Sequence, residues 1–285
     1  MHAIARSLMA VLCVSPGLAA GGAALAQSGG PSSSETAVPG APLALSYELH
    51  AGGLHAFSID TEVTLAPERY ALDLELRTDG WLSWILDWSL SSRAAGRADD
   101  AGLRPERFRT ESRWRGKPRW VELRYDGGPA PRVEVEPPQE EDDRDPVPEA
   151  LRADTLDPLT AGLALVHALM TGGRCEGEAA VFDGRRRFDA QAEDAGSAEV
   201  PVSDLAPYGG EAVACRLNVV PVTGFWRDER NNTDPQELLV YLRPVIEGQL
   251  PVPVRVEAET RFGAVRVHLV SAGLAQERQR AALGD

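Results

Sequence analysis

The sequence has 285 residues, of which 43% are hydrophobic and 25% charged, and its formal net charge is -14. This composition is that of an ordinary globular protein, and it excludes collagen-like, coiled-coil, low-complexity and disulfide-dense classes. The negative charge argues against a nucleic-acid partner, because binding to phosphates requires a cationic surface.

The first 26 residues predict a secretory signal peptide. Residues 8–26 carry no charge and end in Ala24-Leu25-Ala26, where small residues flank a cleavage position. Pro16 and several glycines interrupt the apolar run before it reaches the roughly 20 residues that a membrane span needs. We therefore expect cleavage after Ala26 and a mature chain without a transmembrane segment. Cys13 follows Leu12 rather than a small residue, which argues against a lipid anchor.

Residues 27–42 are rich in Ser, Gly and Pro and predict a flexible linker. We expect a single β-rich domain over residues 43–272 and a polar tail over residues 273–285. Within the domain, apolar residues recur with period two, which is typical of half-buried antiparallel strands. The clearest alternating segments are Leu43 to Leu49, Phe57 to Val63, Leu72 to Leu76, Phe108 to Trp114, Val121 to Tyr125 and Val252 to Ala258.

Turn signals separate these segments at short intervals, and the clearest is Asp183-Gly184, which predicts a two-residue hairpin. The number of strands indicates a mainly β (α+β) fold. We expect a large curved antiparallel sheet or incomplete β-barrel, with one or two short helices covering its open side.

A short helical turn is predicted near residues 80–88, because Trp81, Trp84, Ile85 and Trp88 recur at helical spacing. Such a turn would present its indoles on one side, and a site that is apolar along its body and polar at its rim suits indoles. These four residues are the candidate ligand-binding site. Ordinary packing of the turn onto the sheet is the alternative.

Two later segments also depart from the alternation. Asp157-Pro158, the apolar residues that follow and Gly172-Gly173 predict a helix with an acidic N-cap and a glycine stop. Residues 234–242 begin like a capped helix, but Leu238 to Leu242 is short and rich in strand formers, so we predict a strand there.

Basic residues gather on the predicted strands around residues 104–119 and on the hairpin at residues 185–187. The residues that could contact an anionic group are Arg113, Arg115, Arg119, Arg185 and Arg186, since guanidinium forks recognise phosphates and carboxylates. The alternative is a solvated strand face protected by charge. The acidic, proline-containing stretch 134–157 predicts a mobile loop that could pair with these strands.

Signal cleavage leaves Cys175 and Cys215 as the only cysteines. In an exported protein they predict a structural disulfide, worth about 4 kcal/mol in the chain-entropy model. A redox-active pair is disfavoured, because no Cys-x-x-Cys spacing is present. Lys117 is the only lysine among many arginines, which suggests a GC-rich bacterial genome and hence a periplasmic location.

Several short motifs, in order, resemble an exported bacterial family known as domain of unknown function 3108. They are Tyr47 with Ala51-Gly52-Gly53-Leu54, Tyr70, Thr78-Asp79-Gly80, Trp114-Arg115-Gly116, Asp157-Pro158-Leu159, Val181 to Arg186, Pro251 to Arg255 and Phe262-Gly263. The resemblance implies an envelope-facing protein. By weaker analogy it also implies a sheet like that of the lipoprotein carriers LolA and LolB, curled around an apolar cavity. It supplies no catalytic residues, and fold analogy does not transfer function.

The residues themselves contain no catalytic signature: there is no nucleophile elbow, zinc-protease motif or phosphate-binding glycine loop. His50 and His55 flank a predicted Gly-Gly turn, where we expect exposed side chains, and a site shared with His167 or His268 would need chance convergence. We therefore predict no metal, no cofactor and no catalytic residues.

These observations favour a periplasmic, non-enzymatic protein that binds or carries an apolar or amphipathic component of the cell envelope. The alternative is a structural or interaction protein with a filled interior that docks an envelope protein and supports envelope integrity. An enzyme acting on envelope polymers is the least favoured reading.

Overall fold

The computed structural model describes residues 41–84, 86–99, 101–114, 116–139, 144–226, 236–260 and 263–276. The predicted signal peptide and nearly all of the predicted linker lie outside these residues. So does the predicted C-terminal tail beyond Gln276.

Thirteen antiparallel strands form one sheet in the described part of the chain. Their order is β7-β6-β5-β4-β3-β2-β1-β13-β12-β11-β10-β9-β8, so the sheet does not close and β7 and β8 are its two edges. The strands are β1 (Leu43–Ala51), β2 (Leu54–Leu65), β3 (Arg69–Thr78), β4 (Trp88–Asp99), β5 (Gly102–Trp114), β6 (Lys117–Arg124), β7 (Arg132–Glu136), β8 (Gly177–Phe182), β9 (Arg187–Val200), β10 (Gly210–Thr223), β11 (Gln236–Arg243), β12 (Val252–Thr260) and β13 (Gly263–Leu274). The predicted class, an incomplete barrel of antiparallel strands, is confirmed.

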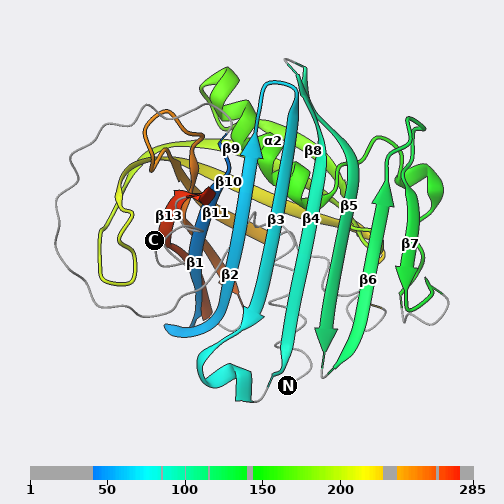
Figure 1. Ribbon diagram of the computed structural model, residues 1–285, viewed down its shortest axis with the longest axis horizontal. Helices are drawn as coiled ribbons and strands as arrows, with labels where there is room; N and C mark the ends of the chain where they lie inside the picture. The colour runs from blue at the N-terminus through cyan, green and yellow to red at the C-terminus, as the bar shows by residue number, and fades with distance from the viewer. Residues whose placement is uncertain are drawn as a thin grey trace.

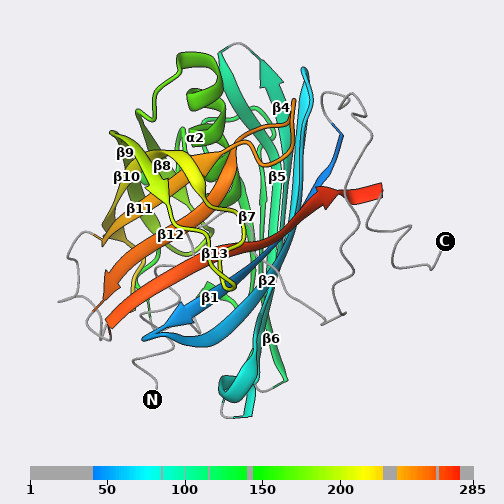
Figure 2. The same ribbon diagram turned by 90° about the vertical axis from the view of Figure 1, so that its left-hand side faces the viewer.

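The sheet bends back on itself near β1 and β13. Figure 1 shows β2 to β6 as a broad wall in front of the later strands, and Figure 2 shows the two halves diverging like the sides of a trough. Side chains at alternate positions face the inside of the trough, where the main core lies, as in β3 with its alternating exposed and buried residues. The period-two pattern in the sequence is thus the pattern of the two sheet faces.

The helix α2 (Pro158–Gly172) lies between the two halves at one end of the trough (Figure 2). Its boundaries confirm the sequence prediction. The Asp157 side chain accepts a hydrogen bond from the Thr160 backbone, Pro158 occupies the first turn, and Gly173 ends the helix in the left-handed conformation. The predicted strand at residues 238–242 is also confirmed, as part of β11.

Two local predictions need correction. The hairpin between β8 and β9 turns at Gly184-Arg185, one residue later than predicted, because Phe182 pairs with Arg187 and the Asp183 carboxylate accepts hydrogen bonds from the Arg185 and Arg186 amides. The acidic stretch 134–157 is not one loop. Its described residues include part of β7 and the 3-10 turn η3 (Glu149–Leu151), while residues 140–143 lie outside the described chain.

Packing of the β8-β9 hairpin tip covers the open side of the sheet near β6. Gly184 has a φ of 91°, and a Cβ at this position would overlap the Val121 side chain of β6. Gly224, with a φ of 84°, is packed against the backbone of Arg185 and Arg186 in the same way. Glycine is required here both by the left-handed backbone and by the close approach of two segments distant in sequence.

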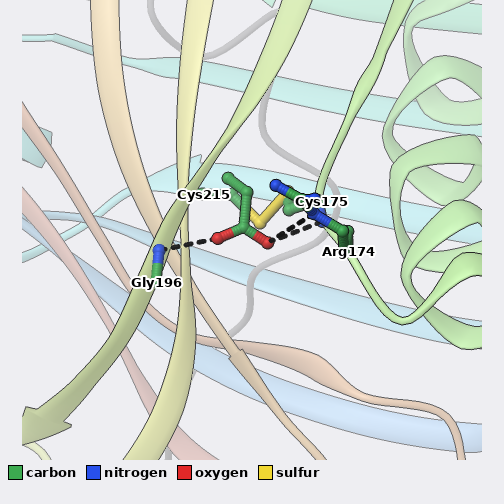
Figure 3. The surroundings of a disulfide bond; sticks show 5 residues. Arg174, Cys175, Gly196 and Cys215 are labelled. Atoms are coloured by element: carbon green, nitrogen blue, oxygen red, sulfur yellow. Dashed lines mark hydrogen bonds and ion pairs between the residues drawn. A yellow bond between two sulfur atoms is a disulfide. The ribbon is translucent and has the colours of Figure 1, made fainter.

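The disulfide between Cys175 and Cys215 joins the segment after α2 to β10, across a sequence separation of 40 residues. Both cysteines are fully buried. The carboxylate of Asp194 accepts hydrogen bonds from the backbone amides of Gly196 at 2.7 Å and Cys175 at 3.4 Å, and both of these residues are labelled with the bridge in Figure 3. The predicted pairing is present, and it ties the segment that follows the C-terminal end of the helix to β10.

We expect Gly184→Ala to lower the free energy of unfolding by about 1–3 kcal/mol more than Gly196→Ala. Gly196 is the matched control, because its φ of 81° is similar but open space surrounds its Cβ position. Urea unfolding of both variants measures the difference. If both variants lose the same unfolding free energy, the contact between the hairpin tip and β6 does not contribute to stability.

Candidate functional site

An apolar cavity lies between α2 and the inner face of β8 to β12. Its walls contain no charged side chain, and its volume is about 40 Å³. The lining residues are Pro158, Ala161, Gly162, Leu165, Val166, Val181, Phe188, Ala190, Leu217, Val240, Leu242 and Pro253. Pockets that bind small molecules usually hold about 300–1,000 Å³, so this cavity can accept an alkyl chain only if the helix moves.

The helix α2 is an uncharged cover over this apolar space. From Pro158 to Gly172 the helix contains no Asp, Glu, Lys or Arg. Leu159, Leu163 and Val166 are buried, while Leu165 is only half-buried and Met170 is exposed. A helix that is apolar on most sides is normally enclosed. Here it is enclosed only partly, so α2 leaves apolar surface at the mouth of the trough.

A buried polar network anchors the N-terminal end of α2. The Thr160 hydroxyl donates to Asp157 Oδ2 at 2.6 Å, and its backbone N–H donates to Asp157 Oδ1 at 2.9 Å. The Tyr70 hydroxyl of β3 lies 2.8 Å from Thr160 Oγ1, to which it donates because the threonine proton is already engaged. The helix is therefore tied to β3 at one end and to β10, through the disulfide, at the other.

Burial raises the pKa of Asp157 to about 6, against the opposing effect of the hydrogen bonds from Thr160. The side chain is fully enclosed, and a carboxylate is poorly solvated there. Burial likewise raises the pKa of Tyr125, whose hydroxyl is enclosed without a hydrogen-bond partner. The N-terminal anchor of α2 thus contains a carboxyl group, that of Asp157, whose charged form is destabilised by burial.

The predicted tryptophan site is not assembled by the described side chains. Trp84 ends the 3-10 turn η1 (Gly80–Trp84) and is 92% exposed, whereas Trp88 begins β4, is only 6% exposed and packs edge-on against Phe57. Ile85 and the side chain of Trp81 lie outside what the structure describes. The expectation of indoles on one side is wrong for Trp84 and Trp88, because the chain leaves the turn before Trp88 and enters the core as a strand.

The anion-contact candidates separate into two groups. Arg113 is an exposed residue of β5, and Arg115 is not described. Arg119, Arg185 and Arg186 lie near aromatic rings and acceptors at one end of the trough. The Arg119 guanidinium is 5.9 Å from the Trp226 ring, Arg186 Nε donates to Asp183 at 2.7 Å, and Arg185 donates to the Pro137 carbonyl.

Arg144 joins this second group from outside the predicted set. Its guanidinium lies 4.1 Å from the Trp226 ring. Although burial raises the pKa of Asp183, the charges of Arg186 and Arg144 hold it below its usual value. No local signal identified Arg144, because its partner Trp226 is distant in the sequence. These contacts stabilise the covered side of the sheet, and we assign no ligand to them.

The outer face of β5 and β6 conforms to the alternative of a charged, solvated strand face. Glu122 is enclosed by Arg107, Arg109 and Arg124 at 2.6 to 3.1 Å. Burial alone would raise the pKa of Glu122, but the three guanidinium groups lower it to about 2. The arginines of these strands are thus largely engaged by neighbouring carboxylates.

Three histidines converge in a way that the sequence analysis did not expect. The ring of His50 lies 5.4 Å from that of His55 and 5.8 Å from that of His268, on the outer face of β1, β2 and β13. His50, which we expected to be exposed, is buried, and so is His268, whose pKa is lowered by burial to about 4. Among the described residues, no group of three or more His, Cys, Asp or Glu side chains is arranged to hold a metal ion.

The comparisons with known proteins concern family and fold. The chain matches, over residues 46–270, the family described as "Protein of unknown function (DUF3108)", while no curated protein matches it. Among solved structures, it is similar to a "Beta-barrel-like Protein of Domain of Unknown Function DUF1849 from Brucella abortus", with a TM-score of 0.50 and 11% sequence identity. The similarity covers 83% of this chain and 99% of that chain, and it concerns the fold alone. Within the described chain, no helix is both long enough and apolar enough to cross a membrane.

We expect Asp157→Asn to flatten part of the pH dependence of stability. A carboxyl whose pKa is raised from 3.8 to about 6 on folding contributes stability that is present at low pH and is lost as the pH rises through the folded value. Relative to the asparagine variant, the wild type should therefore lose about 2.4 kcal/mol of unfolding free energy between pH 4 and pH 7.

Urea unfolding of both proteins across this pH range tests the expectation. The difference between the two proteins isolates Asp157, because His268, whose pKa is lowered, acts in the opposite direction in both. A constant difference at every pH would show that Asp157 does not ionise in this range.

Proposed function

Because the chain belongs to the DUF3108 family, whose description assigns no activity, we propose its function from geometry: it binds the apolar chain of an amphipathic cell-envelope molecule between α2 and the inner face of β8 to β12. The observation that carries the proposal is the apolar cavity beneath a charge-free helix at the mouth of an unclosed sheet. As part of the same proposal we place the protein in the bacterial periplasm. The predicted signal peptide supports this location, and so does the disulfide, since such bonds persist in oxidising compartments.

Occupation of the site requires α2 to lift, since the cavity of about 40 Å³ is far smaller than an acyl chain. The two anchors set the direction of that movement. A disulfide holds the C-terminal end covalently, whereas hydrogen bonds of Asp157, Thr160 and Tyr70 hold the N-terminal end. We therefore propose that the N-terminal end opens and the C-terminal end acts as the hinge.

The small cavity also favours one second candidate. If α2 never leaves the trough, the interior is filled by side chains and the protein is a structural or interaction component of the envelope. The two candidates differ in one measurable property, namely saturable binding of an apolar chain.

We expect the wild type to bind cis-parinaric acid, a fluorescent fatty acid, saturably at one or a few sites. Ala190→Phe should weaken this binding by about tenfold or more, because the ring would occupy the floor of the cavity. Ala71→Phe is the matched control, since Ala71 is exposed on the outer face of β3. Thermal unfolding checks that both variants fold.

A variant that enlarges the cavity separates loss of binding space from loss of folding as the cause of weaker probe binding. Leu165→Ala removes a half-buried cavity-lining side chain and should bind the probe at least as tightly as the wild type. If neither the wild type nor Leu165→Ala shows saturable binding, the carrier proposal is wrong and the filled-interior candidate stands.

The hinge proposal predicts a kinetic effect of the disulfide. Replacing Cys175 and Cys215 together by Ser frees the second end of α2, so we expect faster association of the probe in stopped-flow fluorescence, together with a loss of about 4 kcal/mol in stability. The measurement is made well below the melting temperature of the variant. Unchanged association with reduced stability would show that the C-terminal end of the helix does not limit access.

A further inference from the structure

The turn η1 carries the most exposed tryptophan of the described chain. Trp84 is 92% exposed, although indoles are usually buried for the most part in folded proteins. Leu54, at the tip of the neighbouring β1-β2 hairpin, is 56% exposed. The turn projects at the lower end of the molecule, opposite to α2 (Figures 1 and 2). This surface is separate from the cavity and does not depend on the function proposed above.

Hydrogen bonds hold this turn in place. The Asp79 backbone N–H donates to the Ala56 carbonyl at 3.0 Å, and the Thr78 hydroxyl donates to the Leu86 carbonyl at 2.7 Å. The Ser58 hydroxyl donates to the Asp79 carboxylate at 2.5 Å, which lowers the pKa of Asp79. The platform beneath the indole is therefore fixed at both of its junctions with the sheet.

The apolar residues of the turn divide between the core and the solvent. Leu82 and Leu86 pack against the core, whereas Trp84 points away from it. Exposing an indole on a fixed platform contributes nothing to folding, because its apolar surface remains in water. Indoles are enriched where a protein contacts another surface, because the ring is apolar and its N–H is polar.

Among strands β1 to β7, antiparallel topology brings three connections to this end of the sheet: the β1-β2 hairpin, the β3-β4 link that contains η1, and the β5-β6 turn. The last of these contributes two exposed cations, Arg113 and Lys117, the only lysine of the chain. Neither makes an ion pair with another described residue, in contrast to the arginines around Glu122. One exposed carboxylate, that of Asp87, also lies near this end and partly offsets their positive charge.

We propose that this end of the protein, comprising Leu54, Trp84, Arg113 and Lys117, docks on the surface of a lipid bilayer with anionic headgroups. Indoles favour the boundary between headgroups and acyl chains, because the ring is apolar and its N–H is polar. Arg113 and Lys117, which form no ion pair with another described residue, lie at the same end of the sheet as the indole and can contact lipid phosphates there. Trp84 and Leu54 enter the interface while the sheet remains outside it.

Vesicle binding of the folded protein tests this proposal. The probes are vesicles of phosphatidylcholine alone and vesicles that also contain phosphatidylglycerol. Brominated phosphatidylcholine is included in both, because it quenches indoles that reach the acyl boundary. We expect binding to the anionic vesicles with quenching, and a loss of about tenfold in affinity for Trp84→Ala.

The control variant is Leu205→Ala. Leu205 is also exposed, at 54%, but it lies in the β9-β10 connection at the opposite end of the sheet. This variant should bind vesicles like the wild type. Because Trp84 is exposed, Trp84→Ala should leave the melting temperature nearly unchanged, so that lost binding cannot be ascribed to unfolding.

Charge reversal distinguishes the two parts of the surface. Lys117→Glu should weaken binding to the anionic vesicles without changing the weak binding to phosphatidylcholine alone. The proposal is overturned if the wild type binds neither vesicle, as it would if the tip contacted a protein instead, or if Trp84→Ala binds as tightly as the wild type. Neither outcome bears on fatty-acid binding in the cavity, which is measured without a bilayer.

Discussion

An antiparallel sheet that curves without closing has to cover an apolar inner face and two unpaired edges, and this constraint organises the whole molecule. The inner face is covered at one end by α2, which lies between the two halves of the sheet. The open side near β6 is covered by the tip of the β8-β9 hairpin, which approaches Val121 so closely that only glycine fits at position 184. Both covers come from the chain between β7 and β9, so the sheet is covered by its own connections.

The helix α2, which covers one end of the trough, combines an apolar surface that favours burial with a buried carboxylate that disfavours it. The helix itself is uncharged and apolar, which favours burial, yet its N-cap places a carboxylate in a fully enclosed position. Hydrogen bonds to Thr160 satisfy that carboxylate without removing the desolvation that raises its pKa to about 6. The helix is held by hydrogen bonds at its N-terminal end and, through the disulfide, by a covalent bond near its C-terminal end. Under the proposed function, this asymmetry determines at which end the helix opens over the small cavity.

The two ends of the sheet have different chemical characters. One end holds the helix, its anchors and the apolar cavity, and the other presents an exposed indole and two exposed cations on short connections. Between the two ends, the outer face of β5 and β6 carries arginine-carboxylate ion pairs. These charges keep the face hydrated and disfavour pairing with another strand. A molecule that receives an amphipathic ligand at one end and rests on a lipid surface at the other would need such a separation.

Features that depend on local sequence were predictable. Alternation of apolar residues gives the strands, because neighbouring side chains of a strand face opposite sides. The helix at residues 158–172 follows from an N-cap acid, an early proline and a final glycine, all of which act on the backbone nearby. The disulfide followed from counting, since only two cysteines remain after the predicted cleavage.

Features that depend on register and curvature were decided only by the tertiary structure. His50 and His268 lie on adjacent strands from opposite ends of the chain, and Arg144 meets Trp226 across the covered side of the sheet, so no local spacing reveals either contact. The tryptophans could not be placed from local spacing either. Helical spacing puts Trp84 and Trp88 on one side only if the helix continues to Trp88. The helical turn ends at Trp84 and the chain enters β4 at Trp88, which sends one indole into water and the other into the core. Local patterns thus determine which elements form, whereas the packing of the curved sheet determines which side chains meet.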